Sequence, residues 1–194
     1  MGGFGMDKVY VFLADGFEEI EGLTVVDVLR RGQVEVTTVS VTGQQMIMGS
    51  HKIPVLADGI FEEMNLNDGT LYVLPGGMPG TLNLGGHQGL CQLLENAKTE
   101  GKKLAAICAA PSVLGQLGLL KGETATCHPG FEDKLVGAVA TENSVEVSGQ
   151  ITTSRGMGTA LPFALELLEQ LKGKEAADQV CKGLIWKRRA EESF

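Results

Sequence analysis

The chain has 194 residues and a formal net charge of −8, and 43% of its residues are hydrophobic. This length is enough to bury one sizeable core, so we expect a single domain over residues 1–194. The acidic balance argues against a nucleic-acid partner, which needs clustered Lys and Arg, and no apolar run approaches the roughly 20 residues of a membrane span.

Apolar strand-like runs alternate with segments of helical period through most of the chain. The opening residues 1–6 lack the features of a signal peptide, and we expect them to be disordered or foreign to the domain. The repeating pattern favours a parallel sheet that is buried on both faces, hence a doubly wound α/β sandwich. Predicted strands cover residues 8–14, 34–41, 70–75 and 103–108, and predicted helices cover 18–32, 88–101 and 111–120.

The last third of the chain departs from this simple alternation. Residues 125–137 are typical of a short strand, a turn and a helix, and residues 145–154 of a hairpin around Ser148 and Gly149. Residues 158–173 and 174–186 are predicted to form two closing helices. In doubly wound sheets ligands bind beside the carboxyl ends of the strands, so the turns after the strands are where functional residues are expected.

The four cysteines are scattered without any CxxC spacing, which argues against a structural zinc site and a disulfide framework. They are Cys91, Cys108, Cys127 and Cys181. Free thiols favour a reducing compartment, so we expect a cytoplasmic protein.

Cys108 stands in the stretch AAICAAP, where a predicted strand meets a predicted helix. Pro111 suits the first turn of that helix, which places Cys108 in a tight strand-to-helix turn. Unpaired backbone N–H groups there favour the thiolate, and the small Ala109 and Ala110 leave the sulfur approachable. A buried cysteine that acts as a small hydrophobic residue is the alternative, and position alone does not separate the two.

Two further turns follow predicted strands. The pair Gly76 and Gly77 in VLPGGMPG allows backbone N–H groups to approach a ligand, so Gly77 could donate to an oxyanion; an ordinary tight turn is the alternative. His128 follows another strand beside Pro129, and it is either a base or a simple turn residue.

Glu21 is the candidate acid of the first predicted helix. It aligns with Val25 and Leu29, so it extends the apolar stripe toward the strand-end face, where burial would raise its pKa. Glu18 and Glu19 are rivals with an ordinary place near the positive helix end, and periodicity separates them from Glu21 only weakly.

Together these stretches resemble a known family. In chain order they are ADGFEEIE, LPGG, AAICAAP, CHPGFEDKLVG and TSRGMGTA. They are similar to the ThiJ/PfpI superfamily, in the branch of the parkinsonism-associated protein deglycase (DJ-one-like), and the resemblance runs from about Val9 to Gly183. It implies a flavodoxin-like sandwich, a homodimer with the first helix at the interface, and no metal or organic cofactor.

The resemblance also implies roles for individual residues. The implied catalytic set is Cys108 as the reactive cysteine, Glu21 as the protonated acid in contact with its sulfur, and His128 as the third member. Backbone N–H groups of Gly77 and Ala109 would form an oxyanion-binding pair, and the residues implied to line the pocket are Gly76, Ser154 and Arg155.

The chain departs from the wider superfamily at informative positions. Members with peptidase character carry histidine directly after the nucleophile, where this chain has Ala109, which argues against a cysteine peptidase. The late His-x-Glu pair of glutamine amidotransferases is absent from the sequence. His51 stands where the branch often has a pocket-facing arginine, and Cys127 could couple to Cys108 only if the two sulfurs are within reach.

Two functions use the same residues. The first is a deglycase or glyoxalase that acts on reactive aldehydes such as methylglyoxal, or on their adducts with amines or thiols, and releases a hydroxy acid. The second is an oxidative-stress sensor or redox-regulated chaperone in which Cys108 is oxidised to a sulfinate. A role in thiazole monophosphate biosynthesis has weaker support, because no phosphate-binding motif is visible.

Overall fold

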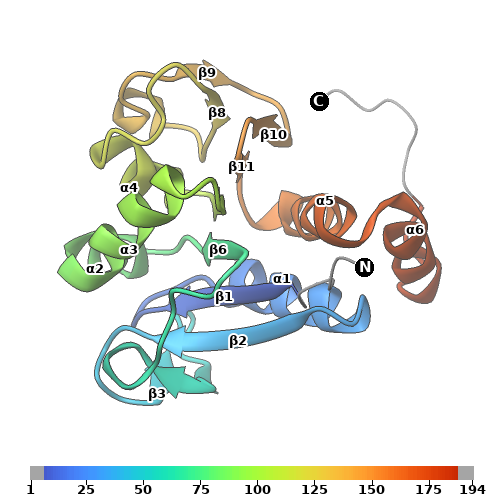
Figure 1. The fold of residues 1–194 in the computed structure, drawn as a ribbon, viewed down its shortest axis with the longest axis horizontal. Helices are drawn as coiled ribbons and strands as arrows, with labels where there is room; N and C mark the ends of the chain where they lie inside the picture. Colours follow the sequence, from blue (N-terminus) through green and yellow to red (C-terminus); the bar gives the residue numbers. More distant parts are fainter. Residues whose placement is uncertain (1–6, 188–194) are drawn as a thin grey trace.

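A central, mainly parallel sheet organises the computed structural model, which describes residues 7–187 (Figure 1). Within those residues the sheet has seven strands in the order β10-β11-β7-β6-β1-β2-β5, and only β10 and β11 pair antiparallel. The strands are β1 (Lys8–Leu13), β2 (Glu35–Ser40), β5 (Gly59–Ile60), β6 (Leu71–Leu74), β7 (Lys103–Ile107), β10 (Val145–Ser148) and β11 (Ile151–Ser154). The prediction for residues 1–6 lies outside the described residues.

The central strand β1 explains why its sequence is a continuous apolar run. Val9 and Val11 belong to the core on one face of the sheet, and Tyr10 and Phe12 belong to the core on the other. β1 pairs with β2 on one side and β6 on the other, and all of its residues after Lys8 are buried. The doubly wound, flavodoxin-like sandwich predicted from the sequence is confirmed.

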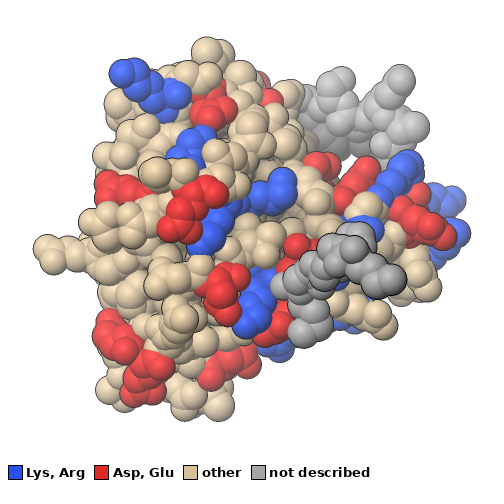
Figure 2. All heavy atoms as spheres, viewed as in Figure 1, with Lys and Arg blue, Asp and Glu red and all other residues tan. Residues whose placement is uncertain are grey.

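Six α-helices in the described part of the chain cover the two faces of this sheet (Figure 1). One face carries α1 (Glu19–Arg31), α5 (Ala160–Lys172) and α6 (Lys174–Gly183), and the other carries α2 (Gly80–Gly86), α3 (Gln88–Thr99) and α4 (Pro111–Gln116). None of them is long and apolar enough to cross a bilayer. Acidic and basic side chains are interspersed over the face of the molecule that Figure 2 shows.

Several short elements differ from the sequence-based prediction. The helix after Cys108 ends at Gln116 instead of residue 120, because the chain turns at Gly118, whose φ is +72°. The helix expected within residues 125–137 is only the 3-10 turn η2 (Glu132–Lys134), which follows β8 (Thr124–Thr126). Elements that the sequence did not indicate are β3 (Met46–Met48), β4 (Pro54–Leu56), β5, η1 (Phe61–Glu63), α2, β9 (Val139–Thr141) and η3 (Met157–Thr159).

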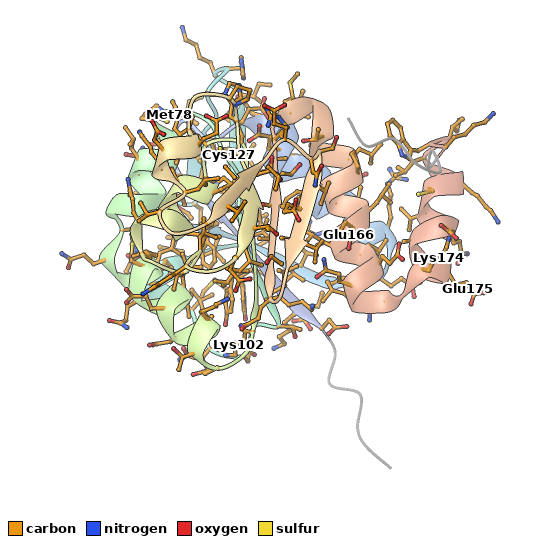
Figure 3. The ribbon with its side chains drawn as sticks, turned by 90° about the horizontal axis from the view of Figure 1, so that it is seen from above. Met78, Lys102, Cys127, Glu166, Lys174 and Glu175 are labelled. Atoms are coloured by element: carbon orange, nitrogen blue, oxygen red, sulfur yellow. The ribbon has the colours of Figure 1, made fainter. Side chains whose placement is uncertain are left out.

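Four neighbouring strands of the sheet run parallel, so their carboxyl ends lie at the same end of the sheet. They are β11, β7, β6 and β1. Figure 3 shows Met78, which follows β6, and Cys127, which follows β8, at one end of the molecule. Lys102, which precedes β7, lies at the opposite end. The turns that carry the candidate residues therefore meet at a single end of the fold.

Candidate active site

Cys108 directly follows β7 and occupies a left-handed backbone conformation, with φ of +65°. This conformation is uncommon for a residue with a side chain, and neighbouring strands hold it in place. The Cys108 N–H donates to the Ser154 carbonyl at 2.9 Å, and the Cys108 carbonyl accepts from the His128 N–H at 2.8 Å. The sharp turn predicted before α4 is thus present, and the thiol is half-buried.

Backbone N–H groups of Gly77 and Ala109 lie close enough to the Cys108 thiol to lower its pKa. Gly77 has φ of +91°, and a Cβ at this position would overlap Glu18 N and Gly16 O, so only glycine fits. The two N–H groups expected to form an oxyanion pair therefore converge on the reactive atom. Their role with a substrate stays a prediction.

Glu21 lies in the first turn of α1 and is fully buried. Its Oε2 accepts a hydrogen bond from the Gly76 N–H at 2.9 Å, and its carboxyl interacts with the Cys108 thiol. The other oxygen, Oε1, receives no hydrogen bond from a nitrogen or hydroxyl within residues 7–187. A Cβ on Gly76 would lie 2.6 Å from both Cys108 Cβ and Glu21 Oε2, so this glycine allows the carboxyl and the thiol to meet.

The carboxyl and the thiol form a coupled pair. Burial raises the pKa of Glu21 to about 7, although hydrogen bonds from the Cys108 thiol and Gly76 act in the opposite direction. Burial and the negative charge of Glu21 raise the pKa of Cys108 to about 12, against the N–H groups of Ala109 and Gly77, which lower it. Each group therefore holds its proton more tightly than a free carboxyl or a free thiol does, and a charge on one disfavours a charge on the other.

This proton balance corrects the expectation that the turn by itself favours the thiolate. The N–H groups act with the expected sign, but burial and the Glu21 charge outweigh them. When a proton resides on Glu21, the charge that opposes the Cys108 thiolate is absent. The nucleophile is therefore available in the form in which Glu21 is protonated.

The two rival acids are occupied elsewhere. Glu18 is the N-cap of α1, and its Oε2 accepts from the Glu21 N–H at 2.8 Å. Glu19 Oε2 lies 2.8 Å from Nδ1 of His51, so His51 forms an ion pair at the start of α1. One cluster of possible metal ligands is found among residues 7–187: it consists of Glu18, Glu19 and His51, whose ligand atoms lie within 4.8 Å of one another. These side chains already form hydrogen bonds with other groups of the protein.

His128 is exposed and follows β8. Its Nδ1 lies 3.0 Å from the Pro129 carbonyl oxygen, which can only accept, so Nδ1 carries the proton and Nε2 of the neutral ring keeps a lone pair. A Cβ built on Gly156 would lie 3.6 Å from His128 Cδ2 and 3.9 Å from both Cys108 Sγ and Glu21 Oε1. The three predicted catalytic side chains therefore border the same small space.

The remaining predicted residues, Ser154 and Arg155, follow one another at the end of β11. Ser154 is fully buried, and its hydroxyl bonds with the Ser144 carbonyl at 2.7 Å and with Thr159 Oγ1 at 2.6 Å. Ser154 thus holds the Cys108 backbone through its carbonyl, and its hydroxyl is engaged in the loop. Burial and the charge of Glu132 raise the pKa of Cys127 to about 11, and the charge of Arg155 lowers it. The place of Arg155 in the pocket lining stays a prediction.

Cys127 and Gly156 lie outside the predicted set of site residues. Cys127 is 1% exposed and belongs to the apolar core on the α4 face, and it is a free thiol. Gly156 borders all three side chains that are predicted to be catalytic, and sequence reasoning did not single it out. Its only signal was its place after Arg155 in TSRGMGTA, a motif that was used for other residues.

Comparisons with known proteins show the family of the chain. The DJ-1/PfpI family model matches residues 7–170. The chain is 41% identical over 180 residues to DJ-1 homolog B of Arabidopsis thaliana, covering 92% of this chain and 41% of that protein. It is 31% identical over 169 residues to the glutathione-independent glyoxalase DJR-1.2 of Caenorhabditis elegans, covering 86% of this chain and 89% of that protein.

A solved structure gives the same result in three dimensions. The structure of oxidised Toxoplasma gondii DJ-1 is 37% identical and superposes with a TM-score of 0.91, covering 94% of this chain and all of that one. The chain spans less than half the length of the Arabidopsis relatives that it matches. By its sequence, its fold and the extent of these matches, the chain belongs to the DJ-1/PfpI family, in the branch of the DJ-1 homologues.

Proposed function

We propose that the chain is a cysteine-dependent enzyme of the glyoxalase or deglycase type, acting on methylglyoxal or on its early adducts with amines or thiols. The observation that carries this proposal is the shared space beside Cys108, Glu21 and His128, with two N–H groups directed at the sulfur. The relative whose name is glutathione-independent glyoxalase adds support at 31% identity. Free cysteines and an acidic surface suit a cytoplasmic enzyme.

The first step is addition of sulfur to the aldehyde. Glu21 takes the Cys108 proton, the thiolate attacks the aldehyde carbon, and the carbonyl electron pair moves to oxygen. The N–H groups of Gly77 and Ala109 stabilise the resulting oxyanion, and removal of one such donor costs about 3 kcal/mol in other enzymes. Protonation of this oxygen by Glu21 gives a hemithioacetal.

The second step is an internal redox rearrangement. Nε2 of His128 removes the proton from the former aldehyde carbon, the electron pair forms a double bond to the neighbouring carbon, and His128 returns the proton to the oxygen of that carbon, which gives an enediol. Glu21 then takes the proton of the hydroxyl on the first carbon and passes it to the second carbon. The product is a thioester of lactate, in which the first carbon is oxidised and the second is reduced. Water then cleaves the thioester, so methylglyoxal plus water gives lactate and regenerates the thiol.

A second candidate function rests on the same sulfur environment. Oxidation of Cys108 by two equivalents of peroxide would give a sulfinate and two waters. The N–H groups of Gly77 and Ala109, and a proton on the unpartnered Oε1 of Glu21, are donors for its oxygens. In this role the protein is a redox sensor or chaperone that need not turn over a substrate.

The proposed partner in solution is a second copy of the chain. Apolar side chains are exposed on α1 and on the β3–β4 hairpin, and Ile20, Met46 and Leu56 are 50%, 57% and 65% exposed. Exposed apolar side chains of this kind would be buried in a twofold dimer.

The test compares Cys108→Ser with Cys91→Ser, which alters a thiol outside the site. Lactate formation from methylglyoxal should be lost in the Cys108 variant and retained in the Cys91 variant. Absence of turnover in the wild-type protein would overturn the enzyme proposal. In that case, a gain of two oxygens at Cys108 under mild peroxide, with a higher melting temperature, would favour the sensor.

A further inference from the structure

Gly156 has no conformational reason to be glycine. Its φ is 163° and its ψ is −167°, which is extended backbone that any residue adopts. Thr159 fixes this backbone, because its Oγ1 accepts from the Gly156 N–H at 3.1 Å and its N–H donates to the Gly156 carbonyl at 2.8 Å. The conformation therefore does not depend on the absent side chain.

Packing gives no structural reason for glycine either. A Cβ on Gly156 would meet no atom closer than 3.6 Å, which is ordinary van der Waals contact. Gly76 is different, because a Cβ there would lie 2.6 Å from Cys108 Cβ and 2.9 Å from the Ile107 carbonyl oxygen. Gly76 is required by the fold, whereas at Gly156 the fold would accept a methyl group.

The three atoms nearest to a Cβ built on Gly156 belong to Cys108, Glu21 and His128, the side chains of the proposed chemistry. The position lies 3.9 Å from Cys108 Sγ, 3.9 Å from Glu21 Oε1 and 3.6 Å from His128 Cδ2. These are the distances at which a non-bonded carbon of a bound substrate would contact each group before the carbon–sulfur bond forms. A side chain on Gly156 and a substrate would compete for the same volume.

We propose that Gly156 determines specificity by size: it keeps this space free and admits short, unbranched 2-oxoaldehydes to Cys108. This inference rests on the proposed function for the identity of the substrate, but its steric content does not. Any reagent that must place carbon atoms beside the sulfur meets the same limit.

The test is Gly156→Ala against the matched control Gly158→Ala. Gly158 lies two residues away in the same loop, and a Cβ there would meet nothing within 4 Å. Alkylation of Cys108 is followed by peptide mass spectrometry with iodoacetamide, a small reagent, and N-ethylmaleimide, a larger one. Gly156→Ala should slow the larger reagent about 10-fold more than the smaller, because one methyl group in a tight site has an effect of this size. Gly158→Ala should change neither rate.

Two further readouts separate steric loss from damage to the chemistry. The pH midpoint of iodoacetamide labelling should stay the same in Gly156→Ala, because no ionisable group changes. In turnover, kcat/KM should fall least for glyoxal, more for methylglyoxal and most for phenylglyoxal. Equal effects on all reagents and aldehydes, or the same graded effect in Gly158→Ala, would overturn the inference.

The outcomes also separate this inference from the proposed function. If the wild-type protein turns over no aldehyde but Gly156→Ala shows the graded alkylation, the enzyme proposal fails and the steric role of Gly156 stands. If the wild-type protein turns over methylglyoxal and Gly156→Ala changes neither turnover nor the alkylation ratio, the enzyme proposal stands and the inference is wrong.

Discussion

Two buried carboxyl groups lie two residues apart in the first turn of α1, and their surroundings shift their pKa values in opposite directions. Glu19 faces the loop that carries His51, and Glu21 faces the turn that carries Cys108. Burial raises the pKa of both, yet hydrogen bonds lower the pKa of Glu19 to about 2, while the pKa of Glu21 rises to about 7.

The difference lies in the number of hydrogen-bond donors around each carboxyl. Glu19 receives bonds from the His51 N–H at 2.8 Å, the His51 ring at 2.8 Å and the Ser50 hydroxyl at 3.2 Å. Glu21 receives one nitrogen donor, the Gly76 N–H at 2.9 Å, and interacts with a thiol. A carboxyl that is well supplied with donors stays ionised when buried, whereas one that is poorly supplied holds a proton that can be used in catalysis.

The largest effect is expected when this contrast is tested by removing each acid. Glu21→Gln keeps the shape of the side chain but removes the transferable proton, so turnover of methylglyoxal should fall by roughly 100-fold to 10,000-fold. Glu19→Gln should leave turnover within a few-fold of the wild-type rate, because Glu19 is bonded to a different loop. Steady-state rates at pH 7, with circular dichroism to check folding, decide between these outcomes.

Equal losses in the two variants would show that the start of α1 acts only as a structural unit. If Glu21→Gln kept full turnover, Glu18 would become the candidate acid, since it caps the same helix. Glu18→Gln is therefore measured in parallel.

The next effect is a dependence of stability on pH. The pKa of Glu21 rises from 4.5 to about 7 on folding, so the folded state binds this proton more tightly. The resulting stability is fully present below pH 4.5 and is lost as pH rises to about 7, by roughly 3 kcal/mol. Urea denaturation should show that the wild type loses this much relative to Glu21→Gln between pH 4.5 and 7. Parallel stability curves for the two proteins over this range would contradict the raised pKa.

A smaller effect is expected from Gly76→Ala. The added Cβ would lie 2.6 Å from Cys108 Cβ and Glu21 Oε2, so the turn must shift, at a cost of about 1–3 kcal/mol. The shift separates the carboxyl from the thiol, and iodoacetamide labelling of Cys108 should lose its dependence on pH near 7. Gly86→Ala is the control, because a Cβ there meets nothing within 4 Å.

The sequence predicted the longer strands of the central sheet and the turns that follow them, because their signals are local. The apolar run at residues 8–14 and the AAICAAP turn carry their own evidence. Cys108 and Gly77 follow neighbouring strands of the central sheet, whereas His128 follows β8 of a separate two-stranded sheet. The choice between Glu19 and Glu21 could not be made in this way. The donors that decide it, Ser50 and His51, lie about thirty residues away in the loop that joins β3 and β4, a short hairpin without a strong strand pattern.

Other features could not be predicted because they depend on packing between distant segments. The effect of Glu21 on the pKa of Cys108 requires two elements from opposite halves of the chain to meet. Gly156 adopts an extended backbone, so nothing in its local sequence distinguishes a glycine that provides space from one that allows a turn. The role of Gly156 is seen only from the side chains of Cys108, Glu21 and His128, which surround it in the folded protein.

The smallest expected effect concerns the other side of the comparison, the ion pair of Glu19 with the exposed His51. The hydrogen bond and the charge of Glu19 raise the pKa of His51 above 6.5, so the stability that this pair adds is fully present below pH 6.5 and is lost as pH rises through the folded value. The pKa of Glu19 is lowered from 4.5 to about 2, so its contribution is present above pH 4.5 and is lost as pH falls. Both groups are charged between pH 4.5 and 6.5, and the stability difference between the wild type and His51→Gln should be largest there. Because His51 is exposed, added salt should reduce this difference. If the stability difference between the wild type and His51→Gln instead grows as pH rises above 6.5, the neutral histidine stabilises Glu19. The hydrogen bond alone, without the charge of His51, would then keep this carboxyl ionised.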